Sequence, residues 1–140
     1  MTTLVVDSSV AVKWFIPEVL SDQAARILDD SYELLAPDLL ISEFGNVLWK
    51  KIRRGEIETG EAREILAAFR RVPLEILPGL DLVEAALEIA VAHGRTLYDA
   101  LYVALAVGED CPFITADDRL AYAFARGPLA PHVRPLSAFP

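Results

Sequence analysis

Leu4-Val5-Val6-Asp7-Ser8-Ser9 is the stretch that decides the fold. Three consecutive apolar residues are typical of a short strand that is buried on both faces. The serines that follow are residue types that begin helices, and Pro17 ends the helix that this pattern predicts. A buried strand that passes directly into a helix indicates an α/β protein whose sheet is mostly parallel.

The rest of the chain alternates short apolar runs with longer helical patterns. Strands are predicted over residues 4–6, 34–36, 74–77, 113–115 and 133–136. Helices are predicted over residues 8–15, 21–30, 37–54, 61–71, 80–93, 97–107 and 117–124. We therefore expect one domain over residues 1–140, with helices on both faces of a mostly parallel sheet of four to five strands. Because each strand is predicted from only three or four residues, an all-helical fold stays open.

Composition places the chain among globular proteins. Of its 140 residues, 54% are hydrophobic, yet no apolar run reaches the roughly 18 to 20 residues that a membrane span needs. The chain starts without the basic segment of a signal peptide. Cys111 is the only cysteine, which excludes an internal disulfide and fits a reducing compartment. We therefore expect a cytoplasmic protein.

The formal net charge of −8 argues against bulk electrostatic capture of nucleic acid. It does not exclude an enzyme that acts on nucleic acid, because the carboxylates of a metal site count as negative here and are offset when the ion binds. The two histidines, His93 and His132, lie too far apart in the sequence to form a zinc motif. A bound metal would therefore be a hard one that prefers oxygen.

Acidic residues stand at the edges of several predicted core elements. These acids are Asp7, Glu43, Asp99 and Asp117. A carboxylate in apolar surroundings is costly unless it is paired with a cation. Asp7 and Asp117 follow strands, and the other two lie in the first turns of helices, so all four can face the edge formed by the carboxyl ends of the strands. Together they predict one shared cation site.

Each acid also has a structural explanation. Asp99 can close a capping box with Thr96, and Asp7 can form an Asx turn. Thr115 can cap a helix with Asp118 as the capping-box residue, or Asp117 can itself be the N-cap. Glu43 can be an ordinary solvated helix residue. The metal site is favoured only when the four acids are considered as a set.

At this point the chain resembles the PIN-domain ribonucleases, and among them the VapC toxins of bacterial and archaeal toxin–antitoxin pairs. The resemblance spans about Leu4 to Leu136. It rests on four motifs in order: Val5-Val6-Asp7-Ser8-Ser9, Ser42-Glu43-Phe44-Gly45-Asn46-Val47-Leu48, Tyr98-Asp99-Ala100-Leu101-Tyr102-Val103-Ala104-Leu105-Ala106 and Ile114-Thr115-Ala116-Asp117-Asp118-Arg119-Leu120.

The resemblance implies a three-layer α/β/α sandwich and an endoribonuclease that depends on Mg²⁺ or Mn²⁺ and leaves a 5′-phosphate. The catalytic and metal-binding residues that it implies are Asp7, Glu43, Asp99 and Asp117. It makes Ser9 and Thr115 supporting hydroxyls, and Asn46 the residue that orients Glu43. Asp117 is preferred to Asp118 because the family pattern is Thr-x-Asp. The implied partners are an RNA substrate, a VapB-like antitoxin and a second copy of the chain.

Other α/β functions fit the residues less well. A phosphoacceptor domain needs paired acids after the first strand and a late lysine, but no lysine follows Lys51. A haloacid-dehalogenase-like phosphatase needs an acid where Ser9 stands, and no phosphate-binding glycine loop is present. A non-catalytic regulatory module, and a PIN domain that processes RNA without an antitoxin, stay open.

Basic residues gather at the end of the helix predicted over residues 37–54. They are Lys50, Lys51, Arg53 and Arg54. They can complement the helix dipole, or they can contact the RNA backbone. Lys13 and Arg119, close in sequence to Asp7 and Asp117, are further candidates for phosphate contacts.

Overall fold

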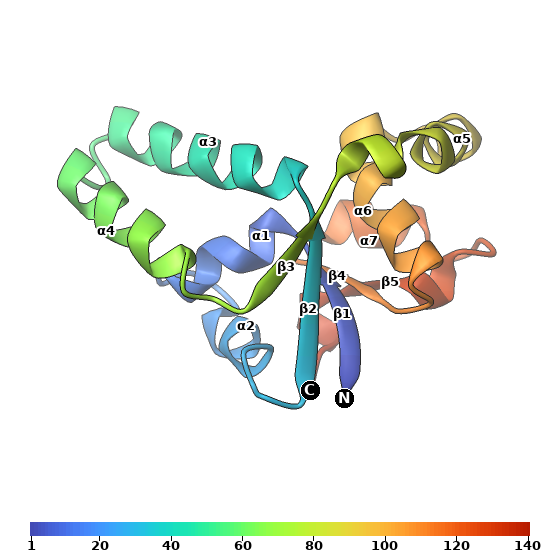
Figure 1. Ribbon diagram of the computed structural model, residues 1–140, viewed down its shortest axis with the longest axis horizontal. Coiled ribbons are helices and arrows are strands. Elements are labelled where there is room, and N and C mark those ends of the chain that lie inside the picture. The colour runs from blue at the N-terminus through green and yellow to red at the C-terminus, as the bar shows by residue number, and fades with distance from the viewer.

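A parallel sheet of five strands forms the centre of the protein (Figure 1), whose computed structural model describes residues 1–140. The strands are β1 (Thr2–Val6), β2 (Tyr32–Pro37), β3 (Leu74–Leu77), β4 (Phe113–Thr115) and β5 (Val133–Pro135). Their order across the sheet is β3-β2-β1-β4-β5, and every neighbouring pair is parallel. The predicted α/β class is therefore confirmed, and the all-helical alternative is excluded.

Seven α-helices connect and cover the strands (Figure 1). They are α1 (Ser8–Ala11), α2 (Ser21–Arg26), α3 (Leu39–Arg53), α4 (Thr59–Phe69), α5 (Val83–His93), α6 (Leu97–Gly108) and α7 (Asp118–Ala123). The helix predicted over 8–15 is a single α-turn followed by a 3₁₀ turn at Val12–Trp14. Likewise, a 3₁₀ turn at Gly79–Asp81 occupies the start of the helix predicted over 80–93. Both differences are at helix ends, where the tighter 3₁₀ geometry is common.

Alternate side chains of β1 enter two different cores. Val5 packs in a cluster with residues of α3, α6 and α7, including Phe44, whereas Leu4 and Val6 pack in a second cluster with Ala24 of α2 and with Ile27, which follows that helix. Successive side chains of a strand point to opposite faces, so an unbroken apolar run is what a strand covered on both sides requires. The predicted three-layer sandwich is confirmed.

The order of the strands decides where a site can form. From β1 the chain continues to β2 and β3 on one side of the sheet, and then crosses to β4 and β5 on the other side. The topological switch point therefore lies between β1 and β4, and ligands of open α/β sheets bind beyond the carboxyl ends of such strands. Asp7 directly follows β1, and Asp117 lies two residues after the end of β4. No helix of the protein is long and apolar enough to cross a membrane.

Candidate acidic site

Asp7 is the buried centre of the acidic site. Only 7% of its surface is exposed. Its Oδ2 accepts hydrogen bonds from Ser9 Oγ at 2.8 Å and from Thr115 Oγ1 at 2.6 Å. Although Asp7 occupies the N-cap position of α1, its side chain does not cap the helix. Burial raises the pKa of Asp7, against the opposing effect of these hydrogen bonds, and the charge of Asp99 raises it further.

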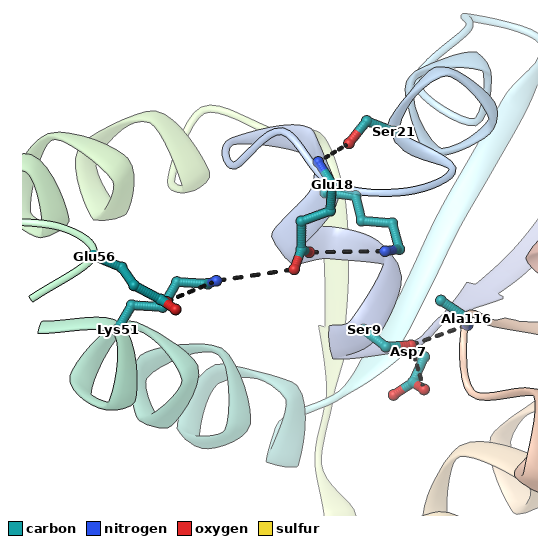
Figure 2. Close-up of polar contacts among 8 residues, drawn as sticks. Asp7, Ser9, Glu18, Ser21, Lys51, Glu56 and Ala116 are labelled. Atoms are coloured by element: carbon teal, nitrogen blue, oxygen red, sulfur yellow. Dashed lines mark hydrogen bonds and ion pairs between the residues drawn. The ribbon is translucent and has the colours of Figure 1, made fainter. Parts of the chain in front are cut away.

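The two hydroxyls that hold Asp7 are themselves held by the backbone after β4. Ser9 Oγ accepts from the backbone N–H of Ala116 at 3.0 Å, and Thr115 Oγ1 accepts from that of Asp117 at 3.0 Å. Figure 2 shows Ser9 between Asp7 and Ala116. The predicted supporting hydroxyls, Ser9 and Thr115, thus bind Asp7 and connect it to the β4–α7 turn.

Glu43 lies in the second turn of α3 and faces Asp7 across Ser8. Its Oε1 accepts a hydrogen bond from the Tyr102 hydroxyl at 2.5 Å and lies 3.4 Å from Ser8 Oγ, which is 3.5 Å from Asp7 Oδ1. Burial raises the pKa of Glu43, and the charges of Asp7 and Asp99 raise it further. Asn46 makes no hydrogen bond to Glu43, so the prediction that Asn46 orients this acid is wrong. Tyr102, from α6, holds it instead.

Asp99 makes part of its predicted capping box and an ion pair with Arg95. Its backbone N–H donates to Thr96 Oγ1 at 3.1 Å, which is half of the capping box. Its carboxylate does not complete the box but accepts from Arg95 Nη2 at 2.9 Å. Because the charge of Asp99 raises the pKa of both Asp7 and Glu43, these acids share one electrostatic environment.

Asp117 uses its carboxylate as a helix cap. Its Oδ1 accepts from the backbone N–H of Arg119 at 3.0 Å and of Leu120 at 3.2 Å, so it is the N-cap of α7. Asp118 is the first residue of that helix, and its prediction as a capping-box residue is wrong. Asp117 is exposed and lines an open hollow of about 270 Å³ with Ser9 and Lys13. Lys13 itself pairs with Glu18 at 3.7 Å.

The acids provide the right donors for a metal, but they are not arranged as a closed site. No group of three acidic, histidine or cysteine side chains is arranged to hold an ion. However, burial and the charge of Asp99 raise the pKa of Asp7, which follows β1, and of Glu43 in α3, and neither of these two acids has a cationic partner. Carboxylate oxygens are the ligands that hard divalent cations prefer, and such a cation would relieve this repulsion. The donor set therefore fits a cation of this class.

The sequence profile of the PIN domain family matches residues 4–125. The chain belongs to the PIN domain family. Ribonuclease VapC3 of Pyrobaculum aerophilum is 37% identical over 123 residues, which cover 86% of this chain and 94% of that protein. Ribonuclease VapC9 of Mycobacterium tuberculosis is 34% identical over 118 residues, which cover 84% of this chain and 88% of that protein.

Solved structures share the fold of this PIN domain. The toxin–antitoxin complex from Klebsiella pneumoniae matches with a TM-score of 0.65 and 16% identity, over 94% of this chain and 95% of the matched chain. At this identity the likeness shows the shared fold alone.

Sequence reasoning missed three residues of the acidic site in this PIN domain: Ser8, Arg95 and Tyr102. Tyr102 also packs in the core, where its ring stacks on Phe113 with ring centroids 5.1 Å apart. A signal for its second role was present, because Tyr102 lies three residues after Asp99 and shares its helix face. Arg95 lies four residues before Asp99, which is the spacing of an ion pair on a helix.

Proposed function

We propose that this PIN domain is an endoribonuclease that requires a divalent metal ion and is the toxin of a toxin–antitoxin pair. The observation that carries the proposal is the convergence of Asp7, Glu43 and Asp99 at the topological switch point, where burial and then the charges of neighbouring acids raise the pKa of Asp7 and Glu43. The ribonuclease names of the VapC relatives support the same activity.

Asp7, Glu43 and Asp99 would hold Mg²⁺ or Mn²⁺, and Asp117 would complete the set from the edge of the hollow beside Ser9. Such an ion, when bound, lowers the pKa of a water and neutralises charge on the leaving oxygen. Supporting this assignment, Glu43 Oε2 and Asp99 Oδ1 accept no hydrogen bond from the protein. These four acids are the catalytic residues that we propose.

The protein's own contacts divide the work among the acids. Ser9 and Thr115 fix the Asp7 carboxylate, so that it can keep its orientation while an RNA phosphate enters. Tyr102 holds Glu43 through Oε1 and leaves Oε2 to accept a proton from the attacking water. No side-chain nucleophile is needed.

RNA cleavage tests this function. Purified protein with Mg²⁺ or Mn²⁺ is expected to cut RNA internally and leave products with 5′-phosphate ends, which ligation of the products to an adaptor that requires this end measures. Single-stranded DNA of the same sequence serves as the comparison substrate. Intact RNA in both metals, at protein concentrations that saturate the substrate, would contradict the proposal.

A VapB-like antitoxin is the protein partner that we propose, and the solved toxin–antitoxin complex with this fold supports it.

We also propose a homodimer. The exposed apolar side chains of α5 and the turn before it lie about one helical turn apart: Leu80, Val83, Leu87 and Val91. Such a stripe on a water-exposed helix indicates a covered face. Light scattering of the purified protein is expected to give twice the mass of one chain, and the mass of a single chain would contradict the dimer. A cytoplasmic location and one domain over residues 1–140 stay predictions.

A further inference from the structure

Glu43 begins a line of polar side chains along one face of α3. Asn46, Lys50 and Arg54 follow at three, seven and eleven residues, and Arg53 lies beside them. We call these five residues the α3 strip. With a rise of about 1.5 Å per residue, the strip reaches roughly 16 Å from the acidic site. Figure 1 shows α3 leaving the carboxyl end of β2 and extending outward to the turn that leads into α4.

The cations of the α3 strip have no acidic partners. Lys50, Arg53 and Arg54 are exposed and take part in none of the ion pairs of the protein. Lys51, next in sequence, is instead paired with Glu18 at 3.9 Å and Glu56 at 3.4 Å on another side of the helix (Figure 2). In a chain of net charge −8, three unpaired cations create a local potential opposite to the overall sign.

Exposed aromatic rings flank both ends of the α3 strip. Trp49 is 50% exposed, and the Arg53 guanidinium lies 5.0 Å from the centre of its ring. Trp49, Lys50, Arg53 and Arg54 line an open hollow of about 360 Å³. At the other end, Tyr98 is 62% exposed and shares an open hollow of about 330 Å³ with Glu43 and Asn46. Cations next to exposed aromatic rings are the means by which proteins bind single-stranded nucleic acid.

We propose that the α3 strip is a binding track for single-stranded RNA that leads the substrate to the acidic site. In this track Lys50 and Arg54 contact backbone phosphates, while Trp49 and Tyr98 stack on bases. The inference rests on the proposed ribonuclease function and names how that site receives its substrate. Favourable interaction with the helix dipole would explain cations in the last turn of α3. It does not explain an exposed tryptophan among them, or their alignment with Glu43.

Salt dependence of RNA binding tests the track. A fluorescent single-stranded RNA of mixed sequence is titrated with protein carrying Asp7→Asn, which keeps the RNA intact, at several salt concentrations. Removing two phosphate contacts by Lys50→Gln with Arg54→Gln is expected to reduce the slope of log Kd against log salt concentration by about 1.4. The matched control is Arg70→Gln with Arg71→Gln, which also removes two positive charges. These arginines lie just before the amino end of β3, whereas the acidic site lies beyond the carboxyl ends of the strands. The control is expected to keep the parent slope.

The stacking contact has its own pair of variants. Trp49→Ala is expected to weaken RNA binding by about tenfold, and Trp49→Phe to restore most of the loss, because a base can still stack on the smaller ring. All of these positions are exposed, so the melting temperatures of the variants are expected to match that of the parent.

These results separate the track from the ribonuclease function. A double variant Lys50→Gln/Arg54→Gln that keeps the parent slope overturns the track, whether or not the wild-type protein cuts RNA. Conversely, wild-type protein that never cuts RNA refutes the function, while the slopes still decide whether the α3 strip binds RNA. If the track and the ribonuclease function are both supported, Lys50→Gln/Arg54→Gln in the otherwise wild-type protein is expected to raise KM and leave kcat unchanged. This is the result of losing contacts that bind the substrate and the transition state equally.

Discussion

Asp7→Asn is expected to reduce the rate of RNA cleavage by at least about a hundredfold. Loss of a residue that only hydrogen-bonds to a metal ligand costs less, roughly 10- to 100-fold. The substitution keeps the shape of the side chain but removes the negative charge at the centre of the acidic site. Asn can still accept hydrogen bonds from Ser9 and Thr115, so the surrounding structure has no reason to rearrange. Initial rates on one labelled RNA, at equal protein concentration, measure the effect.

Two substitutions of supporting residues give the scale for this loss. Thr115→Val and Tyr102→Phe each remove one hydroxyl that holds an acid and are expected to cost about 10- to 100-fold. Tyr102→Phe keeps the ring that stacks on Phe113, which limits its effect on folding. If Asp7→Asn cuts RNA as fast as wild type while melting normally, the assignment of the site is wrong.

Millimolar Mg²⁺ is expected to raise the melting temperature of the wild-type protein by roughly 5 to 10 °C when its concentration is about a hundred times Kd. The shift should be larger at neutral than at mildly acidic pH. Burial raises the folded-state pKa of Asp7 and Glu43 above ordinary values of 3.8 and 4.5. Above the ordinary values, the folded protein therefore holds protons that the unfolded chain has released, and the stability of the metal-free protein falls as pH rises toward the folded-state pKa.

Thermal melting with EDTA and with Mg²⁺, at several pH values, measures both effects. Asp7→Asn is the control, because it removes one of the two raised acids and is expected to reduce both the pH dependence and the response to Mg²⁺. A wild-type melting temperature that is independent of Mg²⁺ at neutral pH would argue that the acids do not form a metal site.

The sheet was predictable because its strands are buried on both faces. A run such as Leu4-Val5-Val6 needs no long-range information to be recognised, since both cores require apolar residues. Helix ends were less predictable. The helix predicted over residues 21–30 ends at Arg26. The prediction was too long because the apolar spacing continues through Ile27, whose side chain packs in the core after the helix has ended.

The candidate site was predictable as a set of acids but not as a set of contacts. Asp7 and Glu43 owe their environment to Thr115 and Tyr102, which lie 108 and 59 residues away in sequence, and no local pattern reports such distances. The capping role of Asp117 was also ambiguous in sequence, because two adjacent aspartates can each begin a helix. Asp117 is the cap of α7 because its backbone is extended and its carboxylate accepts hydrogen bonds from the backbone N–H groups of Arg119 and Leu120.

The direction of the hydrogen bonds around Asp7 implies a conflict between activity and stability. Ser9 and Thr115 each use their oxygen to accept a backbone N–H, so their protons are committed to Asp7 Oδ2. An asparagine in this place would turn its oxygen to the hydroxyls and its NH₂ group toward Ser8 and Glu43. The inactive Asp7→Asn protein would then melt at a higher temperature than metal-free wild type. The residue most needed for cleavage would thus be the one that natural selection retains at the expense of folding.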